Sequence, residues 1–82
     1  NGIYLNYSNN NTITGNTVQN NSSYGIILAS STNNSITGNI TVSNADRNIQ
    51  INSGSNYNII CSNQHGNSIT NSGSNNKVYN NK

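Results

Sequence analysis

The sequence predicts an all-β protein, a right-handed parallel β-helix (β-solenoid) of about four coils that forms a single domain over residues 1–82. Three observations carry this prediction. The stretch SNNNTITGN at residues 8–16 returns as STNNSITGN at residues 31–39. The apolar residues recur at a nearly constant spacing, and they alternate with polar residues inside each copy. Repeats of this length stack, because one unit cannot bury its apolar face alone.

The second strand of each coil is the most regular predicted element. Looser copies of the motif occupy residues 55–63 and 74–81. Four aligned apolar residues, spaced by 23, 23 and 19 positions, are predicted to face the core: Ile13, Ile36, Ile59 and Val78. The repeat is therefore about 23 residues long, and the last coil is shorter.

The first strand of each coil reads Gly-Ile-x-Leu at residues 2–5 and 25–28, and Asn-Ile-Gln-Ile at residues 48–51. The period of two is typical of a strand with one buried face. A fourth copy is predicted around residues 67–70. The purely aliphatic positions are expected to face inward, namely Ile3, Leu5, Ile26, Leu28, Ile49 and Ile51. Their neighbours are expected to face outward, namely Tyr4, Ile27 and Gln50.

A third, weaker strand is predicted at residues 17–19 and 41–43, with Val18 and Val42 facing inward. Three inward columns describe a triangular coil, and stacked coils place equivalent strands in parallel about 4.8 Å apart. Small residues are expected to face inward beside the corner after the second strand, namely Gly15, Gly38, Cys61 and Asn80.

Asparagine supplies 23 of the 82 residues and is interpreted as structural. One unbroken column, predicted to form a ladder, contains Asn10, Asn33, Asn56 and Asn75. Asparagine tolerates the left-handed backbone of a sharp corner, and stacked amides bond to one another. A second, partial ladder is predicted from Asn16, Asn39 and Ser62. Asn44 lies in a turn without a matching column, so its removal is expected to be nearly silent.

The Gly-Ile-x-Leu openings and the Asn-Asn-x-Ile-Thr-Gly-Asn strands at residues 10–16 and 33–39 resemble the parallel β-helix repeats of the NosD-like type. This type is also called the carbohydrate-binding and sugar-hydrolase (CASH) repeat. The resemblance covers nearly the whole chain. It implies a fold rather than an activity, since such repeats occur in pectin-degrading enzymes, epimerases, phage tailspikes, copper-site assembly factors and cell-surface proteins.

The side chains that catalysis needs are scarce, and we expect neither an enzyme nor a cofactor or metal site. Glycoside hydrolysis normally uses two carboxylates, whereas the sequence contains Asp46 and no glutamate. Asp46 and Arg47 are interpreted as an exposed turn pair. Cys61 is interpreted as a buried thiol and His65 as an exposed loop histidine, because a structural zinc site takes four ligands.

Charge and hydropathy exclude two classes of partner. The net charge of +2 comes from four charged side chains and forms no basic patch, so we expect no nucleic-acid binding. No apolar run approaches the roughly 20 residues that cross a membrane, and we expect no membrane partner. An asparagine-rich, low-complexity chain is the alternative to a fold; the regular apolar spacing disfavours it.

The predicted function is that of a non-catalytic structural module, extracellular or on the cell surface: a spacer, adhesin, sheath or fibre element. The chain begins inside a repeat, so we expect further coils of the same chain or head-to-tail self-association into filaments. The alternative is a carbohydrate-binding surface, or a fragment of a polysaccharide-active enzyme or tailspike. The candidate glycan-binding residues are Tyr4, Tyr7, Tyr24, Tyr57 and Tyr79. The candidate N-glycosylation sites are Asn6, Asn20 and Asn21.

Overall fold

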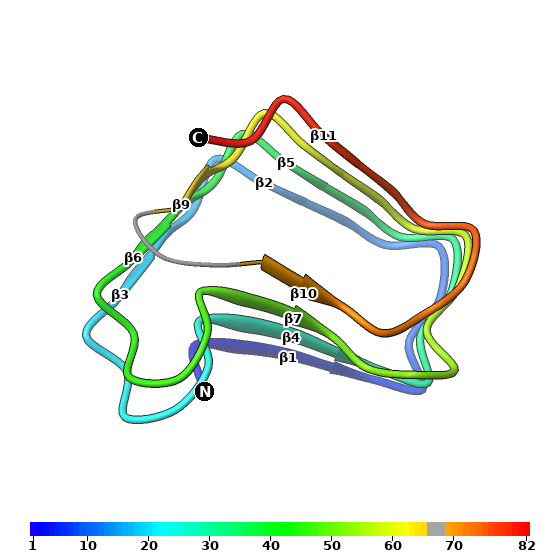
Figure 1. Cartoon of the computed structure of the whole chain (residues 1–82), viewed down its shortest axis with the longest axis horizontal. Coiled ribbons are helices and arrows are strands. Elements are labelled where there is room, and N and C mark those ends of the chain that lie inside the picture. Colours follow the sequence, from blue (N-terminus) through cyan, green and yellow to red (C-terminus); the bar gives the residue numbers. More distant parts are fainter. Residues whose placement is uncertain (66–68) are drawn as a thin grey trace.

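The computed structural model describes residues 1–65 and 69–82, and it confirms an all-β solenoid of stacked parallel strands. The chain winds through three sheets that form the sides of a triangle (Figure 1). The first sheet contains β1 (Ile3–Asn6), β4 (Ile26–Ala29), β7 (Ile49–Ile51) and β10 (Ile69–Asn71). The second contains β2 (Thr12–Thr14), β5 (Ser35–Thr37), β8 (Ile59–Cys61) and β11 (Lys77–Tyr79). The third contains β3 (Thr17–Gln19), β6 (Ile40–Val42) and β9 (Gln64–His65).

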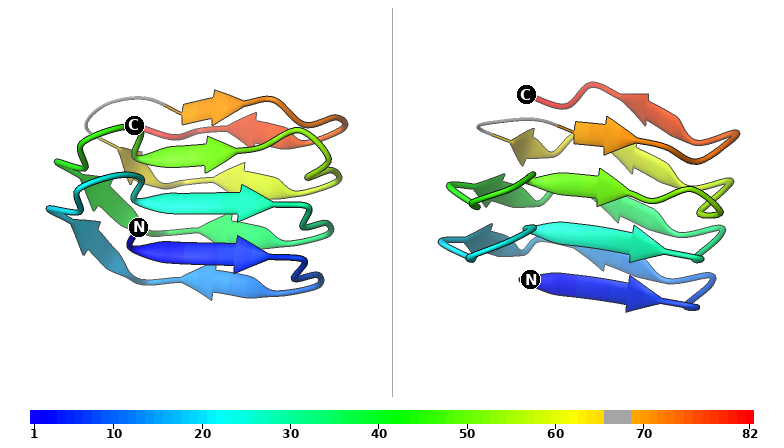
Figure 2. Two further views of the ribbon diagram at one scale, coloured as in Figure 1. Left: turned by 90° about the horizontal axis from the view of Figure 1, so that it is seen from below. Right: turned by 60° about the horizontal axis from the view of Figure 1, so that its bottom comes forward.

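Successive coils lie directly on one another, with the two termini at opposite ends of the stack (Figure 2). Every strand pair is parallel, and each links a strand to its equivalent one coil away. The predicted fourth copy of the first strand is present as β10, which begins at Ile69. The remainder of that prediction, residues 67 and 68, lies outside the described residues.

The first sheet has the predicted register. A buried core cluster contains Leu5, Val18, Ile26, Leu28, Ile36, Ile49, Ile51 and Ile60, and the half-buried Ile3, Ile13 and Ile69 pack against it. Ile27 is not part of this cluster, as its predicted outward position requires. It is nevertheless only 7% exposed, since it lies between Tyr4 and Gln50 in the outer row of the sheet.

The predicted register of the second sheet is wrong in the third coil. Ile60, not Ile59, pairs with Ile36 and Val78. Ile60 is fully buried, whereas Ile59 is 38% exposed. Leu28 and Ser35 are seven positions apart, whereas their partners Ile51 and Ile59 are eight apart, so the third coil contains one extra residue in this turn. Gly54 lies in this turn and has a left-handed φ of 85°. A slip of one residue in a strand exchanges its two faces, so this insertion moves the inward position from Ile59 to Ile60.

The third sheet also differs from its predicted register. Val18 pairs with Thr41, so Thr41 takes the inward position and Val42 the outer row. Thr41 is fully buried, and its hydroxyl donates a hydrogen bond to the Asn48 carbonyl at 2.9 Å. His65 follows in the same column as part of β9, rather than in a loop.

The corner after the second strand is exposed rather than inward-facing. Its members have left-handed backbones, with φ of 69°, 66°, 57° and 53°, and are Gly15, Gly38, Ser62 and Asn80. Cys61, predicted to belong to this column and to be buried, lies instead in the outer row of the second sheet. It pairs with Thr37 and Tyr79 and is half-buried.

Candidate functional site

The corner before the second sheet divides two roles between adjacent residues. The first role is the left-handed turn. It is taken by Asn10, Asn33, Tyr57 and Asn75, whose φ values are 63°, 57°, 59° and 57°. The predicted column is therefore correct for its backbone at three positions, and Tyr57 stands where Asn56 was expected. A bulky residue at positive φ is unusual.

The second role is the ladder itself, which lies one residue later than predicted in three coils and two residues later in the third coil. Its members are Asn11, Asn34, Asn58 and Asn76. The buried Asn34 shows the pattern. Its backbone N–H and its Nδ2 both donate to the Asn58 Oδ1, at 2.8 and 3.1 Å. Its own Oδ1 accepts the Asn11 N–H at 2.8 Å, and its Nδ2 also donates to the Ser8 carbonyl at 2.9 Å. Asn56 has a separate role, since its Oδ1 accepts the Ser74 N–H.

A second ladder runs through all four coils between the second and third sheets. It contains Asn16, Asn39, Asn63 and Asn81, so the predicted third member, Ser62, is wrong by one residue. Each Oδ1 after the first accepts both the backbone N–H and the Nδ2 of the preceding member, at 3.0 to 3.1 Å. The side-chain amides thus connect successive coils and provide acceptors for the backbone N–H groups of the corners.

A third, shorter ladder connects Asn21, Asn44 and Asn48 beside the third sheet. The Asn44 Oδ1 accepts from Asn21, and its Nδ2 donates to the Asn48 Oδ1 at 2.8 Å. Asn44 is buried, so the expectation that it stands outside any column is wrong. At the end of this ladder the buried Asn48 Nδ2 has no hydrogen-bond partner among the described residues.

The five candidate tyrosines lie on different elements and form no single platform. Tyr4 is in the outer row of the first sheet, and the half-buried Tyr24 lies in the loop before β4. Tyr7 and Tyr57 are exposed at corners with left-handed backbones. Tyr79 is exposed in the outer row of the second sheet. A side-chain hydrogen bond with the Cys61 thiol favours the protonated phenol and raises the pKa of Tyr79.

A shallow hollow of about 260 Å³ lies beside one of these tyrosines, on the outer side of the second sheet. It is lined by Asn33, Tyr57, Asn58, Ile59, Asn75 and Lys77. Asn33 and Asn75 flank Tyr57 in the left-handed column, and their carboxamides form no hydrogen bond within the described part of the chain. An aromatic ring, two free amides and one ammonium group therefore meet at this position.

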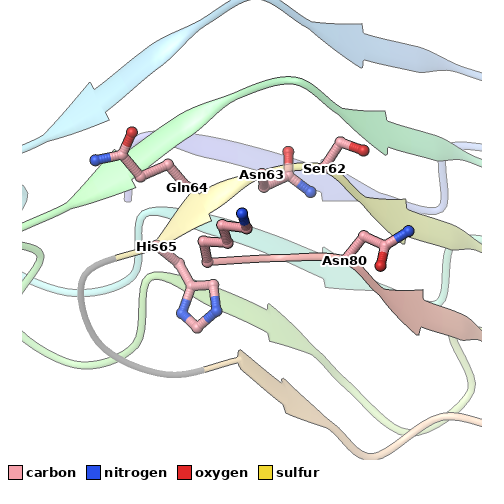
Figure 3. Close-up of a pocket in the computed structure, with 6 residues that line it drawn as sticks. Ser62, Asn63, Gln64, His65 and Asn80 are labelled. Carbon is pink, nitrogen blue, oxygen red and sulfur yellow. The ribbon is translucent and has the colours of Figure 1, made fainter.

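A larger hollow of about 720 Å³ lies at the C-terminal end of the stack. It is lined by Ser62, Asn63, Gln64, His65, Asn80 and Lys82 (Figure 3). The side chains of Gln64 and His65 point to opposite sides of β9 (Figure 3). The Lys82 carbonyl accepts the backbone N–H of His65, so the last residue covers part of the third sheet.

The candidate glycosylation sites differ in access. Asn6 is exposed at the end of β1, and Asn20 is exposed with a φ of 60°. Asn21 belongs to the third ladder, where its Nδ2 donates to the Asn44 Oδ1 at 2.8 Å. The carboxamide that a glycan would modify is therefore already bonded at Asn21.

The titratable side chains do not converge. No three His, Cys, Asp or Glu residues lie together within residues 1–65 and 69–82. Asp46 and Arg47 are exposed, as predicted. The Asp46 carboxylate accepts the Ser23 hydroxyl at 3.4 Å, and the Arg47 Nε donates to the Thr70 hydroxyl at 3.0 Å.

This geometry defines a class of protein: a parallel β-helix repeat held together by inward aliphatic columns and asparagine ladders. The model of the family described as "Periplasmic copper-binding protein (NosD)" matches residues 1–82, and the chain belongs to this family. The description places the family in the periplasm, outside the cytoplasm. No curated protein and no solved structure matches the chain. No helix in the described part of the chain is long and apolar enough to cross a membrane.

The residues of this chain do not fit the copper site that the family description implies. Copper favours thiolate, thioether and imidazole ligands, and the sequence contains one cysteine, one histidine and no methionine. Cys61 lies in the outer row of the second sheet, whereas His65 occupies the inward column of the third. These two donors belong to different faces of the coil.

Proposed function

We propose that the chain is a non-catalytic structural module, a spacer or fibre element of an extracellular or cell-surface protein. One observation carries the proposal: the ladder asparagines use their amides to bond the coils above and below. Asn39, for example, accepts from Asn16 and donates to Asn63. Its carboxamide bonds to the neighbouring coils, and the residue as a whole is 1% exposed. The periplasmic description of the family supports a location outside the cytoplasm.

The scarcity of reactive groups supports a role without catalysis. A pair of carboxylates flanks the scissile bond in most glycoside hydrolases. Here the one acidic side chain, Asp46, is exposed in a turn and bonded to Ser23. A spacer requires only that coils add regularly, and the strand registers provide this regularity.

An inserted coil tests the proposal directly. A second copy of residues 25–47, placed after Arg47, should keep the fold and lengthen the stack by about 4.8 Å. Circular dichroism, thermal melting and small-angle X-ray scattering measure the result. A scrambled insert of the same composition is the control. Loss of cooperative melting with the true repeat, as with the scrambled one, would contradict the proposal. A copper-dependent rise in melting temperature would also contradict it.

A second candidate function, carbohydrate binding, is favoured by the hollow around Tyr57. An exposed aromatic residue replaces asparagine there at a φ of 59°, which costs conformational energy. Strained residues cluster at binding sites. The ring offers an apolar face to a sugar, the carboxamides of Asn33 and Asn75 offer hydrogen bonds to hydroxyls, and Lys77 favours an acidic sugar.

The variant Tyr57→Asn restores the residue found elsewhere in the column, so it should fold normally while losing the ring. A glycan array that includes acidic polysaccharides, followed by calorimetry, compares it with wild type. Tyr4→Asn, in the outer row of the first sheet, is the matched control. Wild-type binding that Tyr57→Asn abolishes and Tyr4→Asn retains would support this function. Absence of wild-type binding at high micromolar concentration would remove it.

A further inference from the structure

The structure separates the Asn-x-Ser/Thr sequons of the chain by whether the amide of the acceptor asparagine is free. The sequence contains these sequons at Asn6, Asn10, Asn20, Asn21, Asn33 and Asn39. The buried Asn39 donates through its Nδ2 to two backbone carbonyls and to the Asn63 Oδ1. The Asn21 Nδ2 donates to the Asn44 Oδ1. A sugar on either nitrogen would therefore disturb hydrogen bonds between coils.

Asn33 differs, because it makes the left-handed corner and is not part of the ladder. The ladder runs through its neighbour Asn34, so the side chain of Asn33 is exposed and forms no hydrogen bond with the described residues. Its backbone N–H donates to the Asn56 carbonyl at 3.2 Å. The hydroxyl of Ser35, the other essential group of this sequon, is likewise unpaired within residues 1–65 and 69–82. Both groups thus lie on the side of the stack, with coils before and after them.

We propose that Asn33 is an N-glycosylation site and that its first sugar packs against the side chains of the next coil. The donor is a lipid-linked oligosaccharide whose first sugar is bonded to phosphate. The Asn33 Nδ2 forms a bond to the anomeric carbon of that sugar, and the bond from this carbon to the phosphate oxygen breaks. The lipid phosphate leaves with the bonding electrons, and the amide loses one proton. This modification goes beyond the proposed structural role.

The next coil places two exposed apolar side chains beside the sequon. Tyr57 makes the same left-handed corner as Asn33, one coil later, at the turns that lead into the second sheet (Figure 1). Ile59 pairs with Ser35 in β8. Tyr57 is 61% exposed, and both apolar residues line the shallow hollow together with Asn33. A sugar on Asn33 would cover this apolar surface, and its removal from water is favourable.

The corner residue of the third coil also needs a reason to be tyrosine. The other three coils have asparagine there, which tolerates a positive φ better than tyrosine does. A ring beside an acceptor asparagine gives the strained residue a role that asparagine cannot fill. Asn10, the free acceptor of the preceding coil, has Asn33 rather than an aromatic residue beside it in this column.

Mapping of the modified asparagines tests the site. The chain is secreted from a eukaryotic host that adds N-glycans, and the folded product is treated with peptide N-glycosidase in heavy-oxygen water. Mass spectrometry should show occupancy at Asn33 at least about tenfold above that at Asn39, although both sequons are complete. Ser35→Ala should abolish modification of Asn33 and leave the fold intact. An unmodified Asn33, or equal occupancy at Asn39, would overturn the inference.

A double-mutant cycle tests the contact with Tyr57. An endoglycosidase trims every glycan to its first sugar in wild type, Ser35→Ala, Tyr57→Asn and the double variant. Removal of the Asn33 sugar by Ser35→Ala should lower the melting temperature by about 4 °C with Tyr57 present and by less than about 1 °C in the Tyr57→Asn background. Tyr4→Asn, on the first sheet, is the matched control background and should keep the full shift. Equal shifts with and without Tyr57 would overturn the contact.

The modification and the proposed functions can fail separately. The inserted-coil experiment uses unmodified protein, so its outcome does not depend on a glycan at Asn33. A sugar on Asn33 occupies the hollow that a free carbohydrate would use, so the glycan array is also performed on unmodified protein. Binding there with no modification of Asn33 in the secreted chain would leave carbohydrate binding and remove the glycosylation site.

Discussion

The first two coils and the last two coils obey the same rules to different degrees. In the first two, the outer row of the second sheet is hydroxylic, with Thr12, Thr14, Ser35 and Thr37. In the last two, the same row contains Ile59, Cys61, Lys77 and Tyr79. The inward residue and the ladder asparagines are nevertheless retained throughout. The comparison teaches that the inward and ladder positions hold the stack, while the outer row is free to vary.

The two halves also differ in the length of their turns. Ladder members are 23 residues apart between Asn11 and Asn34, 24 apart between Asn34 and Asn58, and 18 apart between Asn58 and Asn76. The strand pairs keep their register across both changes, because a connection can gain or lose residues without altering the pairing of the strands that it joins. The C-terminal half therefore remains in register in space although its sequence period is broken.

The largest effect should separate the two neighbouring isoleucines of β8. Ile60→Ala should lower the free energy of unfolding by roughly 2–5 kcal/mol, the usual cost of truncating a buried isoleucine. Ile59→Ala, in the outer row, should cost less than about 1 kcal/mol. Urea denaturation of both variants measures the difference. A larger loss of stability for Ile59→Ala than for Ile60→Ala would mean that Ile59 faces the core, as the 23-residue period predicts. The difference in register between the two halves would then be wrong.

A smaller effect is expected at the ladder of the same coil. Asn58→Ala removes the acceptor of the buried Asn34 N–H and should cost roughly 1–3 kcal/mol. Asn56→Ala removes only the exposed bond to Ser74 and should cost about 0.5–1 kcal/mol. Thermal melts at one pH compare the two. Equal costs would mean that the ladder is no more important than an ordinary turn contact.

Substitutions at the corner after the second strand should change the free energy of unfolding in opposite directions in the two halves. Gly15 has a φ of 69° and open space where a Cβ would lie, so Gly15→Ser should cost about 1 kcal/mol through its backbone alone. Ser62 has a φ of 57° in the equivalent position, so Ser62→Gly should gain a similar amount or less. Calorimetric melting of both variants measures the two changes. If both variants were less stable than wild type, Ser62 would have a role beyond the turn.

The smallest effect concerns pH. The pKa of Tyr79 is raised by its hydrogen bond with Cys61, so the folded state holds this proton more tightly than the unfolded state. The stabilisation is complete below the ordinary tyrosine pKa of about 10 and is lost as pH rises through the folded-state value. Ultraviolet titration of wild type and Cys61→Ser should show one phenol ionising at lower pH in the variant. An unchanged curve would refute the contact.

The sequence alone was sufficient for the fold class, for the first sheet and for the family. In the first two coils the motif repeats without insertion, so residues that align in the sequence are also paired in the sheets. The two inward positions of each first strand followed directly from the alternation at Ile26 and Leu28. The need for asparagine at the corners was also predictable from its conformational tolerance.

Only the tertiary structure decided which neighbour has which role. Asn33 and Asn34 are indistinguishable by type, yet one makes the left-handed turn and the other bonds between coils. Ile59 and Ile60 are identical residues, and the single extra residue in the turn that contains Gly54 determines which is buried. Stacking against the previous coil resolves both choices, because backbone hydrogen bonds impose the register of the neighbouring strand on a sequence whose own spacing has changed.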